Sequence, residues 1–295
     1  MSDAPSPLWT GTWTALVTPM SPDGALDVPA LQKLVHKQID GGVDGLVACG
    51  TTGEAATLTQ AEQAQVIRTV VAAADGRVPV MAGAGTQATR TTIEAVKAAQ
   101  QLGAAGALVV TPFYNKPTQA GLLRHFEQVA EASPLPLMLY NVPSRTGCDL
   151  RAETVVTLSQ HPRIIGVKDA TGDLGRLDVG LAACGPQFAW LSGDDPTACA
   201  FVLMGGHGVI SVASNLLPQD LSAMIAAAQA GDVQAARARH YKLTNILTAL
   251  GLESNPLPIK TALALKGQLT EAFRLPLCPM QPNNRAQLAQ ALAAL

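Results

Sequence analysis

The sequence predicts an α/β fold, a closed (β/α)8 TIM barrel followed by a C-terminal helical appendage. Three observations support this prediction. Short, near-continuous apolar runs occur eight times, alanine-rich segments lie between them, and the strand pattern stops after Gly231. Parallel strands covered by helices are apolar in this way, and eight strand–helix units are the number that closes such a barrel.

The eight predicted strands follow one another along the chain. They span residues 12–19, 44–50, 79–85, 105–112, 135–143, 164–171, 188–195 and 208–214. The segments between them that favour helix include 61–74, 92–103 and 122–132. A doubly wound open sheet is the alternative. That fold usually has fewer strands and a glycine-rich phosphate turn, to which GAGTQA at 83–88 is a weak match.

Three further helical segments follow the last strand, at 232–250, 256–268 and 284–295. We therefore expect residues 1–231 to form the barrel with the catalytic site. Residues 232–295 are expected to form a three-helix appendage that packs against it.

Composition limits the class of protein. Of the 295 residues 48% are hydrophobic, and the net charge is −2 with both signs spread along the chain, so we expect neither nucleic-acid nor membrane partners. The N-terminus shows no leader pattern and no run reaches the ~20 apolar residues of a membrane span, which predicts a cytoplasmic location. The five cysteines and five histidines are dispersed, which favours reduced cysteines and no metal site.

In a TIM barrel the active site lies at the C-terminal ends of the strands. The polar residues expected there are Thr51, Thr52, Tyr114, Tyr140, Asn141, Lys168, Asp169, Asp194 and Asp195. Lys168 is the most unusual, because it closes the apolar run IIGV at 164–167 and lysine is seldom buried without a partner or a use. The structural alternative is a lysine that pairs with Asp169 or extends to the rim.

The catalytic interpretation rests on the chemistry of a poorly solvated amine. Such an amine is more readily neutral, and the neutral form makes a Schiff base with a ketone or aldehyde. The imine turns the adjacent carbon into an enamine nucleophile, which is aldolase chemistry without metal or organic cofactor. Tyr140 and Tyr114 could transfer the protons, or each could be a half-buried aromatic residue. The GTTGE loop at 50–54 suits a carboxylate, or a helix cap alone.

Several motifs resemble those of the dihydrodipicolinate synthase family, the 4-hydroxy-tetrahydrodipicolinate synthases. They are GTTGEAATL at 50–58, VTPFYNKPTQAGL at 110–122, YNVPSRTG at 140–147, GVKDATG at 166–172, LSGDD at 191–195, GGHGVISV at 205–212 and NPLPIK at 255–260. The family belongs to the pyruvate-dependent class I aldolases, which include N-acetylneuraminate lyase.

The resemblance implies a role for each residue that matches the motifs. Lys168 would form the Schiff base with pyruvate. Thr51, Tyr140 and Tyr114 would form a proton relay, with Tyr114 supplied by the neighbouring subunit of a tight dimer. The family is commonly a homotetramer built as a dimer of tight dimers.

Four further residues would bind the substrates. Thr52 would hold the carboxylate of pyruvate, and Gly193 and Ile210 would contribute backbone contacts. Arg145 would bind the carboxylate of the second substrate, L-aspartate 4-semialdehyde, through its guanidinium fork.

The implied reaction condenses these substrates to 4-hydroxy-tetrahydrodipicolinate, the first committed step of lysine and diaminopimelate biosynthesis. The alternative is a related lyase that cleaves a 2-keto-3-deoxy sugar acid, N-acetylneuraminate or 4-hydroxy-2-oxoglutarate, which Arg145 and Tyr114 disfavour. A catalytically inactive barrel that senses a metabolite is a third possibility. Lys168, Tyr140 and Thr51 disfavour it.

The resemblance also bears on feedback inhibition. In relatives that lysine inhibits, a pocket at the tight-dimer interface uses a serine, two histidines, an asparagine, a glutamate and a tyrosine. The matching positions here hold Ala55, Gln60, Gln63, Gln87, Thr91 and Phe113. Because the anionic acceptor for an ammonium group is missing, we expect weak or no inhibition by L-lysine.

Overall fold

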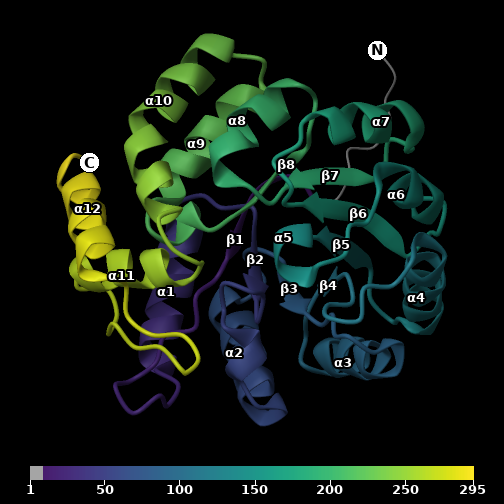
Figure 1. The fold of residues 1–295 in the computed structure, drawn as a ribbon, viewed down its shortest axis with the longest axis horizontal. Helices are drawn as coiled ribbons and strands as arrows, with labels where there is room; N and C mark the ends of the chain where they lie inside the picture. Colours follow the sequence, from purple (N-terminus) through teal and green to yellow (C-terminus); the bar gives the residue numbers. More distant parts are fainter. Residues whose placement is uncertain (1–8) are drawn as a thin grey trace.

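Eight parallel strands close into a barrel in chain order, and β1 pairs with both β2 and β8 (Figure 1). The structure, a computed structural model, describes residues 9–295. The strands are β1 (Gly11–Ala15), β2 (Gly45–Ala48), β3 (Val80–Gly83), β4 (Gly106–Val110), β5 (Leu137–Asn141), β6 (Ile164–Asp169), β7 (Ala189–Ser192) and β8 (Gly208–Ser211). Each strand falls on one of the predicted apolar runs, so the predicted (β/α)8 barrel is confirmed.

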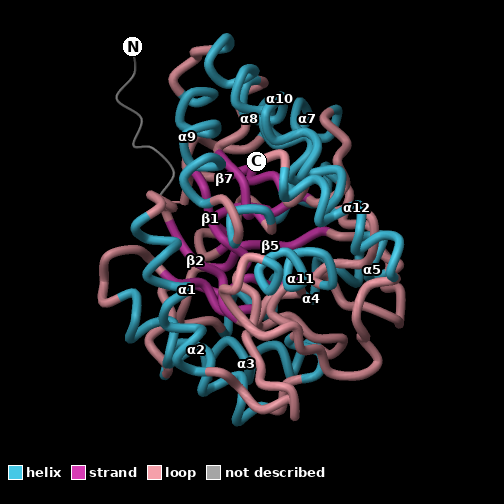
Figure 2. Tube along the Cα trace, turned by 90° about the vertical axis from the view of Figure 1, so that its left-hand side faces the viewer, coloured by secondary structure: helices cyan, strands magenta, loops and turns pink. Residues whose placement is uncertain are grey.

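Helices surround the strands, which lie at the centre of the molecule (Figure 2). They are α1 (Val28–Asp40), α2 (Gln60–Ala74), α3 (Thr89–Gln101), α4 (Gln119–Ala132), α5 (Pro143–Thr146), α6 (Ala152–Leu158), α7 (Gly175–Ala183), α8 (Asp195–Leu203) and α9 (Pro218–Gln229), with short turns η1 (Ala55–Thr57) and η2 (Ala213–Asn215). Local caps start several of them. Thr59 and Glu62 form a capping box at α2, and the side chains of Asp27 and Asp194 cap α1 and α8.

Apolar side chains form two groups, one inside the barrel and one between strands and helices. The inside group consists of Trp9, Trp13, Ala15, Val47, Met81, Leu108, Met138, Tyr140, Val142, Ala189, Leu191 and Ile210. The rings of Trp9 and Trp13 stack with centroids 4.7 Å apart and fill the end where the strands begin. Because successive side chains of a strand point to opposite faces, this group identifies the positions that face the barrel axis.

Three helices follow the barrel: α10 (Val233–Leu250), α11 (Leu257–Leu265) and α12 (Pro282–Ala293). They agree with the predicted helical segments, and Figure 1 shows them on one side of the barrel, with α10 beside α8 and α9. Leu243 of α10 and Ile259 of α11 belong to the same apolar group as the outer face of the barrel. The division into units 1–231 and 232–295 stays a prediction.

Two expectations concern membrane-spanning segments and an N-terminal leader. None of the helices in residues 9–295 combines the length and apolarity needed to cross a membrane. The expectation that the N-terminus carries no leader falls largely on residues 1–8, which lie outside the described residues.

Candidate active site

Lys168 lies inside the barrel near the C-terminal end of β6. Its register partners are Tyr140 on β5 and Leu191 on β7, both in the inside group, so all three side chains face the barrel axis. The lysine is 5% exposed, and its Nζ lies 4.3 Å from the centroid of the Tyr140 ring. The alternative in which Lys168 pairs with Asp169 is wrong: Asp169 points to the opposite face of β6 and pairs with Arg176 at 3.0 Å.

Gly193, which follows β7, leaves the space that the lysine side chain occupies. A Cβ atom at this position would lie 2.9 Å from Lys168 Cε and 2.7 Å from Ala170 Cβ. A larger residue would therefore displace the amine. The Gly193 N–H donates to the Asp169 carbonyl at 2.6 Å, and Ile210 is fully buried on β8 in the inside group.

The GTTGE turn, residues 50–54, follows β2. Backbone hydrogen bonds within it, from Gly53 to Gly50 and from Glu54 to Thr51, are each 3.1 Å long. Thr52 is buried, and its hydroxyl accepts a hydrogen bond from Asn255 Nδ2 at 3.0 Å.

Asn255 connects this turn with Arg145. The guanidinium of Arg145, in α5, donates from Nη2 to the Asn255 carbonyl at 2.9 Å. Within residues 9–295, Asn255 Oδ1 is a buried acceptor without a hydrogen-bond partner. The sequence analysis did not assign Asn255 to the site; its place at the start of NPLPIK was the only signal, and the contact with Thr52 appears only in three dimensions.

Tyr114 lies in the loop after β4 and is exposed. It is 92% exposed and has a φ of +75°, and its N–H donates to the Thr146 carbonyl at 3.2 Å. The loop after β4 is thus attached to α5, while the aromatic ring extends into solvent. No hydrogen bond in the described part of the chain joins the hydroxyls of Thr51, Tyr140 and Tyr114, so the proton relay stays a prediction.

Four polar residues that the sequence places at this end of the barrel support the fold instead. Asp169 pairs with Arg176 and accepts from Asn141 Nδ2 at 3.3 Å, behind β5 and β6. Asp194 caps α8, and Asp195 accepts two backbone N–H groups from the segment after β8. Burial raises the pKa of the Asp195 carboxyl, against the effect of those hydrogen bonds.

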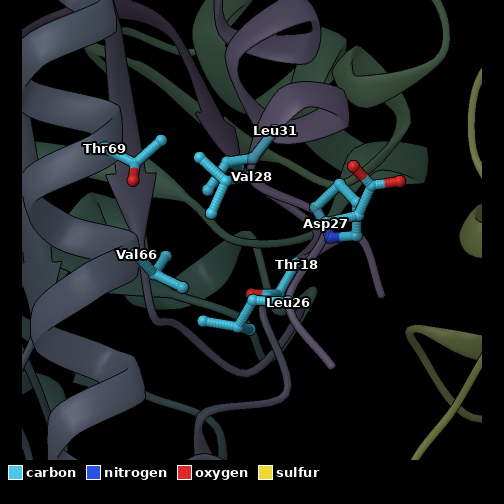
Figure 3. Close-up of a pocket in the computed structure, with 8 residues that line it drawn as sticks. Thr18, Leu26, Asp27, Val28, Leu31, Val66 and Thr69 are labelled. Atoms are coloured by element: carbon cyan, nitrogen blue, oxygen red, sulfur yellow. The ribbon is translucent and has the colours of Figure 1, made fainter. Parts of the chain in front are cut away.

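Two surface clefts contain none of the predicted site residues. One is a mainly apolar crevice between α1 and α2, seen in Figure 3, and the other lies between α1 and the start of α9. Among residues 9–295, no three histidine, cysteine, aspartate or glutamate side chains are grouped as metal ligands. The side-chain contacts among the predicted residues lie elsewhere: the Lys168 amine is beside the Tyr140 ring, and Thr52 and Arg145 each contact Asn255.

The comparisons with known proteins cover the barrel, the residues around Lys168 and the appendage. A sequence model of the Dihydrodipicolinate synthetase family matches residues 8–295. The 4-hydroxy-tetrahydrodipicolinate synthase of Methylococcus capsulatus is 50% identical over 282 residues, which cover 96% of this chain and 97% of that protein.

Two solved structures have the same fold. The chloride-inhibited dihydrodipicolinate synthase from Acinetobacter baumannii, complexed with pyruvate, is 46% identical with a TM-score of 0.95, covering 97% of this chain and 98% of that one. The enzyme from Cyanidioschyzon merolae with lysine bound is 38% identical with a TM-score of 0.95, covering 98% and 99%. Since these matches include the barrel, the residues around Lys168 and the appendage alike, this chain belongs to the dihydrodipicolinate synthetase family.

Proposed function

We propose that this chain condenses pyruvate with L-aspartate 4-semialdehyde to 4-hydroxy-tetrahydrodipicolinate, the first committed step of lysine and diaminopimelate biosynthesis. The observation that carries the proposal is the buried amine of Lys168 inside the barrel, against the Tyr140 ring. The names of relatives at 45% to 50% identity favour this synthase over the sugar-acid lyases and over an inactive sensor.

The reaction begins at Lys168 Nζ. The neutral amine attacks the ketone carbon of pyruvate, and loss of water gives the imine. A proton leaves the methyl carbon to give the enamine, whose carbon attacks the aldehyde of the second substrate. The amino group of the adduct then attacks the imine carbon, closes the ring and releases the lysine. The imine is itself the electron sink, so this sequence needs no metal or organic cofactor.

Proton transfer is assigned to Thr51, Tyr140 and Tyr114. Tyr140 lies beside the amine in the same chain. Tyr114 is assigned to the site of the neighbouring subunit, an arrangement that its exposed ring and its attachment to α5 support. We infer a homotetramer, built as a dimer of tight dimers, in which each site uses two chains.

Substrate binding is assigned to the chain of contacts from Thr52 to Arg145. Thr52 and the adjacent backbone hold the pyruvate carboxylate, Arg145 holds the carboxylate of aspartate semialdehyde, and Gly193 and Ile210 supply backbone contacts. Asn255 lies between the two anion-binding residues.

Arg145→Ala tests this assignment. We expect kcat/KM for aspartate semialdehyde to fall by the equivalent of roughly 2 to 5 kcal/mol, because a charged hydrogen-bonded pair is lost. Pyruvate imine formation, measured by borohydride trapping, should change little. Arg151→Ala, at another exposed arginine slightly later in the sequence, is the matched control. Equal losses of both activities in Arg145→Ala would instead indicate a structural residue.

We also propose a cytoplasmic location. All five cysteines are free, including the exposed Cys278, which is typical of a reducing compartment.

L-Lysine is expected to inhibit this enzyme weakly or not at all. The amide of Gln63 donates to the carbonyls of Ala55 and Leu58 at 3.0 and 3.4 Å, so it is already engaged within its own segment. Neither Gln63 nor Thr91 supplies the negative charge that a buried ammonium group requires. The missing charge-assisted hydrogen bond corresponds to about 1.5 to 3 kcal/mol of binding free energy.

A lysine titration of the initial rate at subsaturating pyruvate checks this expectation. Thr91→Glu, which restores an acidic side chain, should strengthen any inhibition. Half-inhibition of the unmodified enzyme at submillimolar lysine would refute the interpretation.

A further inference from the structure

A buried ion pair joins the GTTGE turn to the appendage. Lys260 of α11 contacts Oε1 of Glu54, and both side chains are 0% exposed. The ammonium also lies 5.1 Å from the centroid of the Phe273 ring. Burial lowers the pKa of Lys260, and the attraction of Glu54 opposes that shift. The sequence analysis assigned neither residue a role.

Stability alone explains such a pair poorly. Taking two charges out of water costs about as much free energy as their attraction returns, and apolar pairs of similar volume are often as stable. What an ion pair adds is a defined geometry, because each charge must meet its partner. Glu54 is the last residue of the GTTGE turn, so the pair fixes the position of this turn relative to α11.

Contacts from outside the turn hold its last three residues. Asn255 donates to the hydroxyl of Thr52, the Thr18 hydroxyl donates to the Gly53 carbonyl at 2.7 Å, and Lys260 holds the Glu54 carboxylate. Glu54 also has a φ of +53°, a region that residues other than glycine seldom adopt. Outside contacts are therefore needed to keep this backbone shape.

The appendage supplies most of these outside contacts. Asn255 and Lys260 both belong to the segment 255–260, and a second appendage segment adds the Arg274 N–H, 3.5 Å from Glu54 Oε2. The helices after the barrel thus support the turn that carries Thr51 and Thr52.

We propose that Glu54 and Lys260 are positioning residues for pyruvate, whose ion pair keeps the GTTGE turn in the shape that receives the carboxylate. This inference rests on the proposed function, because it assumes that Thr52 and its neighbours bind pyruvate. It adds that the appendage controls the affinity for the first substrate without touching it.

Three variants test the proposal: Glu54→Gln, Lys260→Met and the double variant Glu54→Leu/Lys260→Met. The single variants each leave one buried charge unpaired, so their melting temperatures should fall. The double variant leaves no buried charge and should recover much of that loss. All three should raise the pyruvate KM by roughly tenfold while kcat and the KM for aspartate semialdehyde stay within about twofold.

The matched control is a second ion pair of the appendage. Arg285 and Glu271 lie 3.0 Å apart and are partly exposed. Glu271→Gln should leave the pyruvate KM unchanged. A wild-type pyruvate KM in the folded double variant, or an equal rise in Glu271→Gln, would overturn the proposal.

Glu54→Asp keeps the test decisive should the neutral variants not fold. It retains both charges but shortens the side chain by one methylene, so the pair can form only if the turn moves. We expect a raised pyruvate KM in a folded protein, and an unchanged KM would overturn the proposal.

The pyruvate concentration that gives half-maximal borohydride trapping at Lys168 provides a readout independent of the second substrate. It should rise together with the KM in every Glu54 and Lys260 variant. A wild-type enzyme that traps pyruvate but does not consume aspartate semialdehyde would contradict the proposed function and leave this measurement intact.

Discussion

Lys168→Ala is expected to abolish condensation, a loss on the order of 10⁴-fold or more, because in the proposed mechanism this amine forms the covalent intermediate. Pyruvate plus borohydride should add the mass of a reduced pyruvyl group to the unmodified enzyme, on the peptide that contains IIGVKDATG, residues 164–172. The variant should show no such addition. Peptide mass spectrometry measures both outcomes.

Lys37 provides a demanding control for this labelling. Burial lowers its pKa to about 8, so part of this lysine is neutral near neutral pH. Its Nζ, however, donates to the carbonyls of Asn215 and Leu216, each at 2.9 Å, outside the barrel. Lys37→Met should therefore label normally at Lys168. Labelling at Lys37, or at any lysine other than Lys168, would contradict the assignment.

Tyr114→Phe is expected to lower activity by roughly 10² to 10³-fold, because the variant loses the hydroxyl that we propose transfers protons. If Tyr114 acts in the neighbouring subunit, this variant and Lys168→Ala should complement each other. A dimer with one chain of each kind contains one site with both wild-type groups. After complete exchange of equal amounts, half of the dimers are mixed, so about one quarter of the wild-type activity should return.

Tyr140→Phe mixed with Lys168→Ala is the matched control. Tyr140 and Lys168 lie on adjacent strands of one chain, with the amine 4.3 Å from the ring. Every site in a mixed dimer of these variants lacks one of the two groups, so no activity should return. Recovery in this control, or none in the Tyr114 mixture despite demonstrated subunit exchange, would count against a shared site.

The sequence by itself determined the strands and the position of Lys168. Each strand is a short apolar run bounded by polar or glycine residues, and this signal needs only neighbours along the chain. Because barrel sites lie where the strands end, the same local pattern placed Lys168 and Tyr140 at the end of the barrel where we propose the active site. Their direction toward the axis then followed from strand pairing.

Only the tertiary structure decided which polar residues meet. Asn141 and Asp169 come one position after Tyr140 and Lys168, and the alternation of a strand directs them away from the axis. There Asn141 donates to Asp169, and Asp169 pairs with Arg176. Without the strand register, neither composition nor spacing tells which of two consecutive strand residues faces the barrel axis.

The contacts between the GTTGE turn and the appendage could not be predicted from the sequence, for a related reason. Asn255 meets Thr52 across 203 positions, and Lys260 meets Glu54 across 206. Local propensities predict that α11 exists, but they carry no information about which strand end it will approach. That approach depends on closure of the barrel and on the packing of α10 against α8 and α9, where burial of apolar surface, not the polar residues themselves, selects the arrangement.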